Sequence, residues 1–426
     1  MGLKATEVFT PGAFPTYTYV ERPGERLEQL LQDALATPGQ VVSISGPSKS
    51  GKTVLVEKVV GRDNLITVTG AGIKEPDDLW DRVLNWMDVP NSRTMGSSTS
   101  GKVGGELAVE GSGSIPFVAS VQGGAKGSAE VEHTRENETT HERRGLRQVV
   151  EEIANSDYVV LLDDFHYMPR DIQTEAAKVI KEAVRLGVKV CVAAVRHRGD
   201  DVVRANPELR GRVRAIDLKY WTLDELKQIA SIGFDALNIE FSAAAINQFA
   251  TEAAGSPQLM QLVCLNACFV TGAREKSMLR RSIATPQDVL RNIFEQTSAN
   301  TDFRSLVDVL DAGPKTRGTE RKMYKFKDGA EGDVYRCILC AAASDPPALS
   351  FDYETLTRRV TGVCDGDIPV GSSVVGTCLH MSRLALEKFP NERAIDWDEQ
   401  KQIFDIPDPY LLFYLRWSGR LHEASA

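Results

Sequence analysis

The sequence predicts an α/β protein built on a doubly wound parallel sheet, and three observations support this fold class. Short β-branched strands alternate with amphipathic helices over the first half of the chain. A glycine-rich loop follows one strand and leads directly into a helix. Another strand ends in two adjacent aspartates, Asp163 and Asp164. Together these features are typical of a fold that binds a phosphorylated ligand.

The glycine-rich loop is the stretch "GPSKSGKT" at residues 46–53. "QVVSIS" before it is a short β-branched strand, and "KTVLVEKVV" after it has apolar residues at helical spacing. A helix that begins at the lysine turns its first amides toward the phosphate. Lys52 is then expected to reach the terminal phosphates and the Thr53 hydroxyl to ligate Mg²⁺. The predicted nucleotide-binding residues are Gly46, Pro47, Ser48, Lys49, Ser50, Gly51, Lys52 and Thr53.

A second stretch, "GSSTSGKV" at residues 96–103, has the same outline but not the same context. The preceding "VPNSRTM" is no strand, and the following "GGELAVEG" is no helix. Val103 replaces the hydroxyl residue, so a magnesium ion would lack that ligand. We interpret this second stretch as a decoy, and the chain is expected to hold one ATP or ADP with Mg²⁺.

The strand "YVVLLDDF" supplies the acidic residues that such a site requires. Such a site needs an acidic residue here to organise Mg²⁺ and the attacking water, and Asp163 is predicted to bind the metal. A further strand at residues 188–195 ends at Arg196. Helical stretches that begin near Glu25, Pro76 and Arg170 separate the strands, as a parallel sheet requires.

With these motifs, the chain resembles the AAA+ and STAND branches of the P-loop ATPases, including the origin-recognition-like group, over about residues 17–270. The stretch "NPELRGRVRAIDL" is similar to the segment that carries an arginine finger. The resemblance implies that Arg210 and Arg212 reach a neighbouring subunit's γ-phosphate in a homo-oligomer. Surface ion pairs or helix capping are the alternative. Arg196 resembles the STAND sensor of the γ-phosphate. Asp164 stands where related enzymes place the residue that polarises the attacking water. Many AAA+ ATPases have Glu at this position, so the resemblance implies slow hydrolysis.

Residues 221–284 are predicted to form a helical lid. Many AAA+ lids carry an arginine where this chain has Gln258. Gly255-Ser256-Pro257 is similar to the Gly-x-Pro motif of STAND ATPases, which implies that Pro257 packs against adenine. A serine N-cap followed by proline explains the same residues equally well as a helix start. The resemblance favours a nucleotide-controlled switch.

Residues 91–141 form an insert whose apolar and polar residues alternate between residues 103 and 132. This period of two predicts a β-hairpin or three-strand meander. An isolated hairpin is marginal in water, so its apolar face needs a partner. Three interpretations stay open: packing on subunits or a partner, a flexible Gly/Ser-rich loop, and assembly into a membrane pore.

Residues 285–426 are predicted to form a linker and a winged-helix domain. The stretch "PKTRGTERKMYKFKDG" interleaves cations with Tyr324 and Phe326, which could track phosphates and stack bases or could be a solvated linker. "IFDIPDPYLLFYLRW" resembles the wing and last helix of winged helices in related ATPases. The expected recognition helix, at about residues 372–389, has few cations. Its partner could be a protein or duplex DNA.

Composition sets the remaining expectations. Residues 1–220 are predicted as the P-loop domain, the net charge of −9 argues against wholesale coating of nucleic acid, and seven cysteines without framework spacing indicate a reducing, cytoplasmic compartment. Cys337 and Cys340 are interpreted as small residues on an apolar helix. The function expected is an ATP-hydrolysing switch that controls oligomerisation or partner engagement. A DNA-directed loader is the alternative, and a membrane pore a weaker one.

Overall fold

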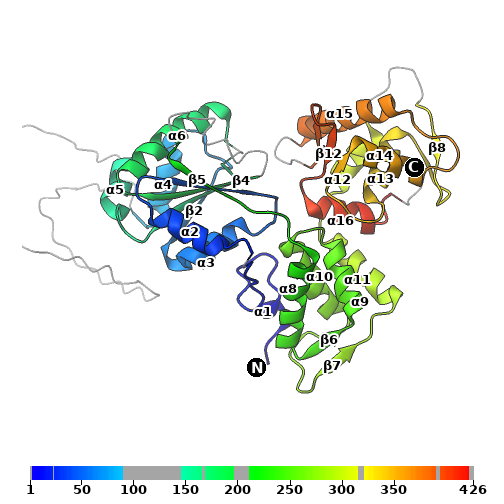
Figure 1. Cartoon of the computed structure of the whole chain (residues 1–426), viewed down its shortest axis with the longest axis horizontal. Helices are drawn as coiled ribbons and strands as arrows, with labels where there is room; N and C mark the ends of the chain where they lie inside the picture. The colour runs from blue at the N-terminus through cyan, green and yellow to red at the C-terminus, as the bar shows by residue number, and fades with distance from the viewer. Residues whose placement is uncertain are drawn as a thin grey trace, which may run out of the picture.

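The computed structural model describes residues 2–22, 24–89, 145–165, 168–195, 211–314, 321–389 and 394–421. An α/β unit, a mainly helical unit and a C-terminal unit follow one another along the chain (Figure 1). The first unit contains a parallel five-stranded sheet in the order β2-β3-β4-β1-β5. Its strands are β1 Val41–Gly46, β2 Leu65–Thr69, β3 Val159–Asp163, β4 Lys189–Val195 and β5 Val213–Asp217.

Helices cover both faces of this sheet, which confirms the predicted α/β fold class (Figure 1). Alternate strand residues point to opposite faces. Val42 and Ile44 therefore pack with α2 and α3, whereas Val160 and Leu162 pack with α4, α5 and α6. The helices are α2 Leu27–Ala36, α3 Lys52–Val60, α4 Pro76–Trp86, α5 Leu146–Ile153 and α6 Arg170–Arg185.

Two of the five strands were not anticipated from the sequence. β2 is short, and its burial pattern alternates only in part. β5 lies at the sheet edge, and three of its five residues are exposed, so it lacks the apolar run that marks β3. Its residues were interpreted only as the arginine-finger segment. Pairing with β1 makes this stretch a strand.

The second unit has one hydrophobic core, and segments that precede and follow this unit in the sequence also contribute side chains to it. It contains α8 Leu223–Ala236, β6 Ile239–Phe241, α9 Ala243–Glu252, α10 Pro257–Val270, β7 Arg281–Ile283 and α11 Gln287–Ala299. The N-terminal helix α1, Ala5–Val8, packs into the same core. The domain boundaries stay predictions, although α11 shares this core and not the C-terminal one.

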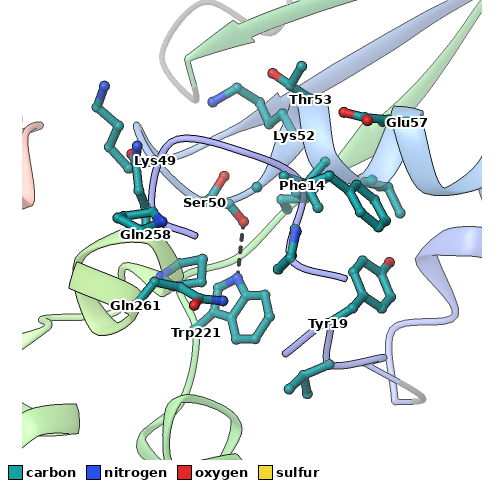
Figure 2. Close-up of a pocket in the computed structure, with 18 of the residues that line it drawn as sticks. Phe14, Tyr19, Lys49, Ser50, Lys52, Thr53, Glu57, Trp221, Gln258 and Gln261 are labelled. Atoms are coloured by element: carbon teal, nitrogen blue, oxygen red, sulfur yellow. Dashed lines mark hydrogen bonds between the residues drawn. The ribbon is translucent and has the colours of Figure 1, made fainter. Parts of the chain in front are cut away.

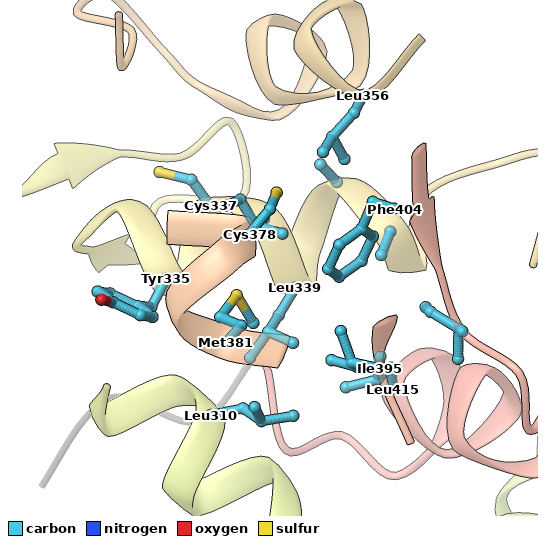
Figure 3. Packing of buried hydrophobic residues seen from close by; sticks show 14 of the residues in the cluster. Leu310, Tyr335, Cys337, Leu339, Leu356, Cys378, Met381, Ile395, Phe404 and Leu415 are labelled. Atoms are coloured by element: carbon cyan, nitrogen blue, oxygen red, sulfur yellow. The ribbon is translucent and has the colours of Figure 1, made fainter. Parts of the chain in front are cut away.

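The C-terminal unit combines helices with a small antiparallel sheet in the order β10-β12-β11. Its core gathers side chains from every helix of the unit (Figure 3). The order of helices and strands agrees with the winged-helix interpretation, which stays a prediction. The elements are α12 Arg304–Ala312, β8 Tyr324–Lys325, β9 Glu331–Gly332, α13 Val334–Ala343, β10 Ser350–Asp352, α14 Tyr353–Val363, α15 Gly371–Lys388, β11 Asp396–Asp398, β12 Ile403–Asp405 and α16 Pro409–Trp417.

The interleaved aromatics of the basic stretch are part of the C-terminal core. Tyr324 and Phe326 are 8% and 4% exposed, so they are not free to stack nucleic-acid bases. Lys322 pairs with Asp367 at 2.9 Å, which offsets its charge. The hypothesis that this stretch stacks bases is therefore wrong for these two rings, because the core needs their apolar surface.

Several predictions fall outside the described residues: the insert at 91–141, the second loop at 96–103, Arg196 and Arg210. Cys337 and Cys340 lie on α13 as free thiols, as the apolar-helix interpretation expected. Within the described ranges, no helix is both long and apolar enough to cross a membrane.

Candidate nucleotide-binding site

The predicted phosphate loop lies where β1 ends and α3 begins. β1 is flanked by β4 and β5, and the carboxyl ends of the parallel strands share this edge of the sheet. Such an edge is where open α/β sheets bind ligands. Lys52 is the first residue of α3, so the first amides of the helix face the loop.

The loop has the backbone that a phosphate cradle requires. Lys49 and Gly51 have positive φ angles of 60° and 94°. Glycine adopts such angles without strain, which explains Gly51. At Gly46 the constraint is space: a Cβ there would lie 2.8 Å from the Cβ of Leu218. The loop is therefore shaped by its glycines as the sequence predicted.

Lys52 and Thr53 point to the side of the loop where phosphate would lie (Figure 2). The Lys52 ammonium donates to the carbonyls of Gly46 at 3.2 Å and Pro47 at 2.8 Å. The Thr53 hydroxyl donates to Asp163 Oδ2 at 2.6 Å. Strand β3 thus brings Asp163 to Thr53 across 110 residues of sequence. The two predicted magnesium ligands are adjacent.

Two carboxylates and one ammonium face one another at this edge. Burial lowers the pKa of Lys52, and the charges of Asp163 and Asp164 oppose that shift. Burial raises the pKa of Asp164, the Asp163 charge adds to the rise, and Lys52 and Lys49 offset part of it. A half-buried carboxyl with a raised pKa suits proton transfer from water better than an ordinary one.

The lid contacts the same loop from the other side. Trp221 Nε1 donates to the Ser50 carbonyl at 3.0 Å (Figure 2). The Ser256 hydroxyl lies 3.4 Å from the Lys49 carbonyl and also caps α10 through the Leu259 amide. Ser256 therefore caps α10, as the helix-start interpretation expected, and the contact of Pro257 with adenine stays a prediction. Pro257 lines the cavity next to the loop.

A cavity of about 420 Å³ lies between the loop, the lid and the N-terminal segment. Phe14 and Tyr19 form one side, and Gln258 and Gln261 form the other (Figure 2). Phe14 stacks on Tyr19 with a centroid separation of 6.0 Å. A cavity of this size with phosphate-binding amides at one end and aromatic rings near the other fits a nucleotide.

The N-terminal segment is the part of this site that the sequence motifs missed most clearly. Residues 10–15 and 18–20 line the cavity, and hydrogen bonds fix this segment to the lid. Gln261 donates to the Thr18 hydroxyl at 2.6 Å and accepts from the Thr10 amide at 3.3 Å. The stretch "YVERPGERLEQLL" resembles the segment that approaches adenine in related ATPases, but it begins only at Tyr19, so no motif marks the residues before it.

The structure brings most predicted site residues together. Arg212 lies elsewhere: its carbonyl accepts from the Val41 amide at the start of β1, at the opposite edge of the sheet. Arg212 therefore cannot reach the phosphates of a nucleotide bound by the same chain, and a role as arginine finger would require a second subunit. The predicted residues that line the cavity are Ser48, Lys49, Ser50, Gly51, Lys52, Thr53, Asp163, Asp164 and Pro257.

The donor set fits Mg²⁺ bound with a nucleotide. Mg²⁺ prefers oxygen ligands and is usually held by one or two protein oxygens plus phosphates and water. The Thr53 hydroxyl and the Asp163 carboxylate are such ligands, and they already lie within hydrogen-bond distance. Among the described residues, no cluster of three His, Cys, Asp or Glu side chains suits a metal without a nucleotide.

Comparison with known proteins yields structural matches but no sequence family. No protein-family model matches the chain, and no curated protein matches it. Cdc6p from Pyrobaculum aerophilum is 14% identical, with 99% of this chain and 98% of that chain covered and a TM-score of 0.41. The Aeropyrum pernix ORC2 protein, in its ADPNP–ADP complexes, is 14% identical, with 99% and 98% covered and a TM-score of 0.49.

A third match is the Walker-type ATPase paby2304 of Pyrococcus abyssi, 12% identical, with 92% of this chain and 95% of that chain covered and a TM-score of 0.48. The likeness is one of fold.

Proposed function

We propose that this chain binds ATP with Mg²⁺, hydrolyses it, and uses the nucleotide state to control its C-terminal unit. The observation that carries the proposal is the Thr53–Asp163 contact of 2.6 Å beside Lys52, at a helix N-terminus that opens into a nucleotide-sized cavity. Lys52 would hold the terminal phosphates, Thr53 and Asp163 the metal, and Asp164 would polarise the attacking water. Mg²⁺, when bound, neutralises charge that develops on the phosphates.

Hydrogen bonds join the phosphate loop to the lid, which supports a role in signalling the nucleotide state. Trp221 links to the Ser50 carbonyl through its indole and to the Gly255 carbonyl through its own amide, at 3.0 and 3.2 Å. A γ-phosphate that moves the loop would therefore move the residues between α9 and α10. Pro257, in the same turn, would contact the base.

The same part of the lid is fixed to the C-terminal unit. Glu252, the last residue of α9, accepts from Arg416 at 2.8 and 2.9 Å and from the Trp417 indole at 2.7 Å. Arg416 and Trp417 end α16. Four residues of lid thus separate the C-terminal contact from Pro257. We infer that the C-terminal unit, acting as a winged helix, changes its position with the nucleotide and engages a protein or DNA partner.

Mass measurement combined with a turnover assay tests this function. Purified protein is expected to hydrolyse MgATP slowly. Its assembly state should differ between ADP and a non-hydrolysable ATP analogue, because only the analogue presents a γ-phosphate to the loop. Addition of duplex DNA tests the partner, since DNA binding would be sensitive to salt. Free exchange of ADP together with an unchanged mass in both nucleotides would contradict the switch.

A further inference from the structure

Asp164 has a backbone conformation that is rare for residues other than glycine. Its φ angle is 57°, in the left-handed region. Such conformations persist only where neighbouring structure holds them, and they gather at functional sites. The direction of the Asp164 carboxylate therefore depends on whatever fixes this one residue.

Gly70 is the residue that lies against Asp164. A Cβ at Gly70 would lie 2.5 Å from the Asp164 carbonyl oxygen and 3.2 Å from the Phe165 Cα. The Gly70 amide donates to the Asp163 carbonyl at 2.8 Å, which extends the β2–β3 pairing one residue past Thr69. Only glycine allows this approach, so the loop after β2 directly supports the turn after β3.

Arg82 in turn holds that loop. Its guanidinium donates to the carbonyls of Thr69 at 3.2 Å, Ala71 at 3.3 Å and Gly72 at 3.0 Å. A planar fork of donors fixes three carbonyls at once, which a lysine ammonium cannot do in the same geometry. These three carbonyls surround Gly70 in the sequence. Arg82 therefore fixes the segment in which Gly70 contacts Asp164.

Asp78 fixes the far end of the same loop. Its Oδ2 accepts from the amides of Lys74 at 2.9 Å and Glu75 at 3.0 Å, and these bonds lower the pKa of Asp78. Asp78 and Arg82 are one helical turn apart on α4, so the helix clamps both ends of the loop. The buried side chains of α4, which anchor it to the sheet, are Leu79, Trp80, Val83 and Leu84.

We propose that Arg82 and Gly70 are positioning residues for hydrolysis, which set the backbone of Asp164 and so aim its carboxylate at the attacking water. Neither residue lines the nucleotide cavity. The proposal rests on the proposed function, because it needs Asp164 to act on water. It differs from a merely structural role in affecting turnover while ATP binding stays intact.

Four variants test the proposal by turnover and by nucleotide titration. Arg82→Met is expected to lower kcat about 10- to 100-fold, since small misplacements of a catalytic group have effects of this size. Arg82→Lys is expected to lie between Arg82→Met and the wild type. Gly70→Ala should resemble Asp164→Asn, the reference for loss of the carboxylate. In all four the Kd for MgATP should stay within about twofold, as uniform binding is untouched.

Arg185→Met is the matched control and should keep the wild-type kcat, because Arg185 is an exposed residue of α6 that lies 4.0 Å from Glu182, which is also exposed. A fall in kcat at an unchanged Kd for MgATP, together with partial rescue by Arg82→Lys, is a readout that general destabilisation does not produce.

The outcomes separate the two claims. If the wild type hydrolyses ATP and the kcat of Arg82→Met lies within about twofold of the wild-type kcat, only the positioning role is overturned. If the protein binds MgATP but shows no turnover that Asp164→Asn lowers, the proposed hydrolysis is overturned, and the positioning role with it. If Gly70→Ala does not fold, the two Arg82 variants decide the question, because Arg82 is only partly buried.

Discussion

Replacing Lys52 with alanine is expected to abolish measurable ATP binding. The Lys52 ammonium already lies on the loop carbonyls of Gly46 and Pro47, where the terminal phosphates would be held. Its loss removes a charge-assisted contact and leaves the phosphate charge uncompensated in a partly buried site. Affinity should fall at least about 100-fold, on the scale of one or two charged hydrogen bonds. Isothermal titration with ATP and Mg²⁺ measures this loss.

Lys102→Ala provides a control with matched sequence, because Lys102 occupies the same place in "GSSTSGKV". This variant is expected to bind ATP as the wild type does, since the flanking sequence predicts neither a strand before that stretch nor a helix after it, and Val103 replaces the hydroxyl residue. Equal losses of affinity in the two variants would overturn the assignment of the site to residues 46–53.

Arg416→Met is expected to destabilise the protein strongly. Arg416 and Glu252 are 7% and 5% exposed and form two hydrogen bonds, at 2.8 and 2.9 Å. Removing the arginine leaves the Glu252 carboxylate buried with only the Trp417 indole beside it. Breaking one side of a buried pair typically costs about 3–5 kcal/mol of unfolding free energy. Urea unfolding of both proteins measures the difference.

Two comparisons show whether the buried charge is the cause. Adding Glu252→Gln to Arg416→Met should recover part of the loss, because it removes the uncompensated carboxylate. Arg383→Met is the surface control: Arg383 and Glu399 lie 3.8 Å apart and are both largely exposed. That variant should change stability by less than about 1 kcal/mol. If Arg416→Met lowers the free energy of unfolding by no more than this, the Arg416–Glu252 pair does not fix the lid to the C-terminal unit.

The parts of the site that the sequence predicts well are local ones. A phosphate loop needs a strand, a tight turn and a helix within about 20 residues, and residues 40–60 contain all three. The two aspartates after a buried strand are equally local. Asp163 and Thr53 are both predicted to bind the metal, and in the structure they lie 2.6 Å apart.

The contacts that the sequence does not predict join distant segments. Trp221 reaches the Ser50 carbonyl over 171 residues, and Gln261 reaches Thr18 over 243. Neither residue belongs to a pattern with a known spacing. Tyr324 and Phe326 show the opposite case, in which a suggestive pattern is explained by burial. Arg82 was also missed, because an arginine on an amphipathic helix is usually a solvated one.

Thr53 and Asp163 are expected to hold a metal ion together with the nucleotide that Lys52 binds. Titration of ATP into the wild type and into Asp163→Asn, each with Mg²⁺ and with a chelator, tests it most directly. The wild type should bind ATP at least about tenfold more tightly with Mg²⁺, and Asp163→Asn should lose most of that difference. Equal dependence on Mg²⁺ in the two proteins would contradict the account.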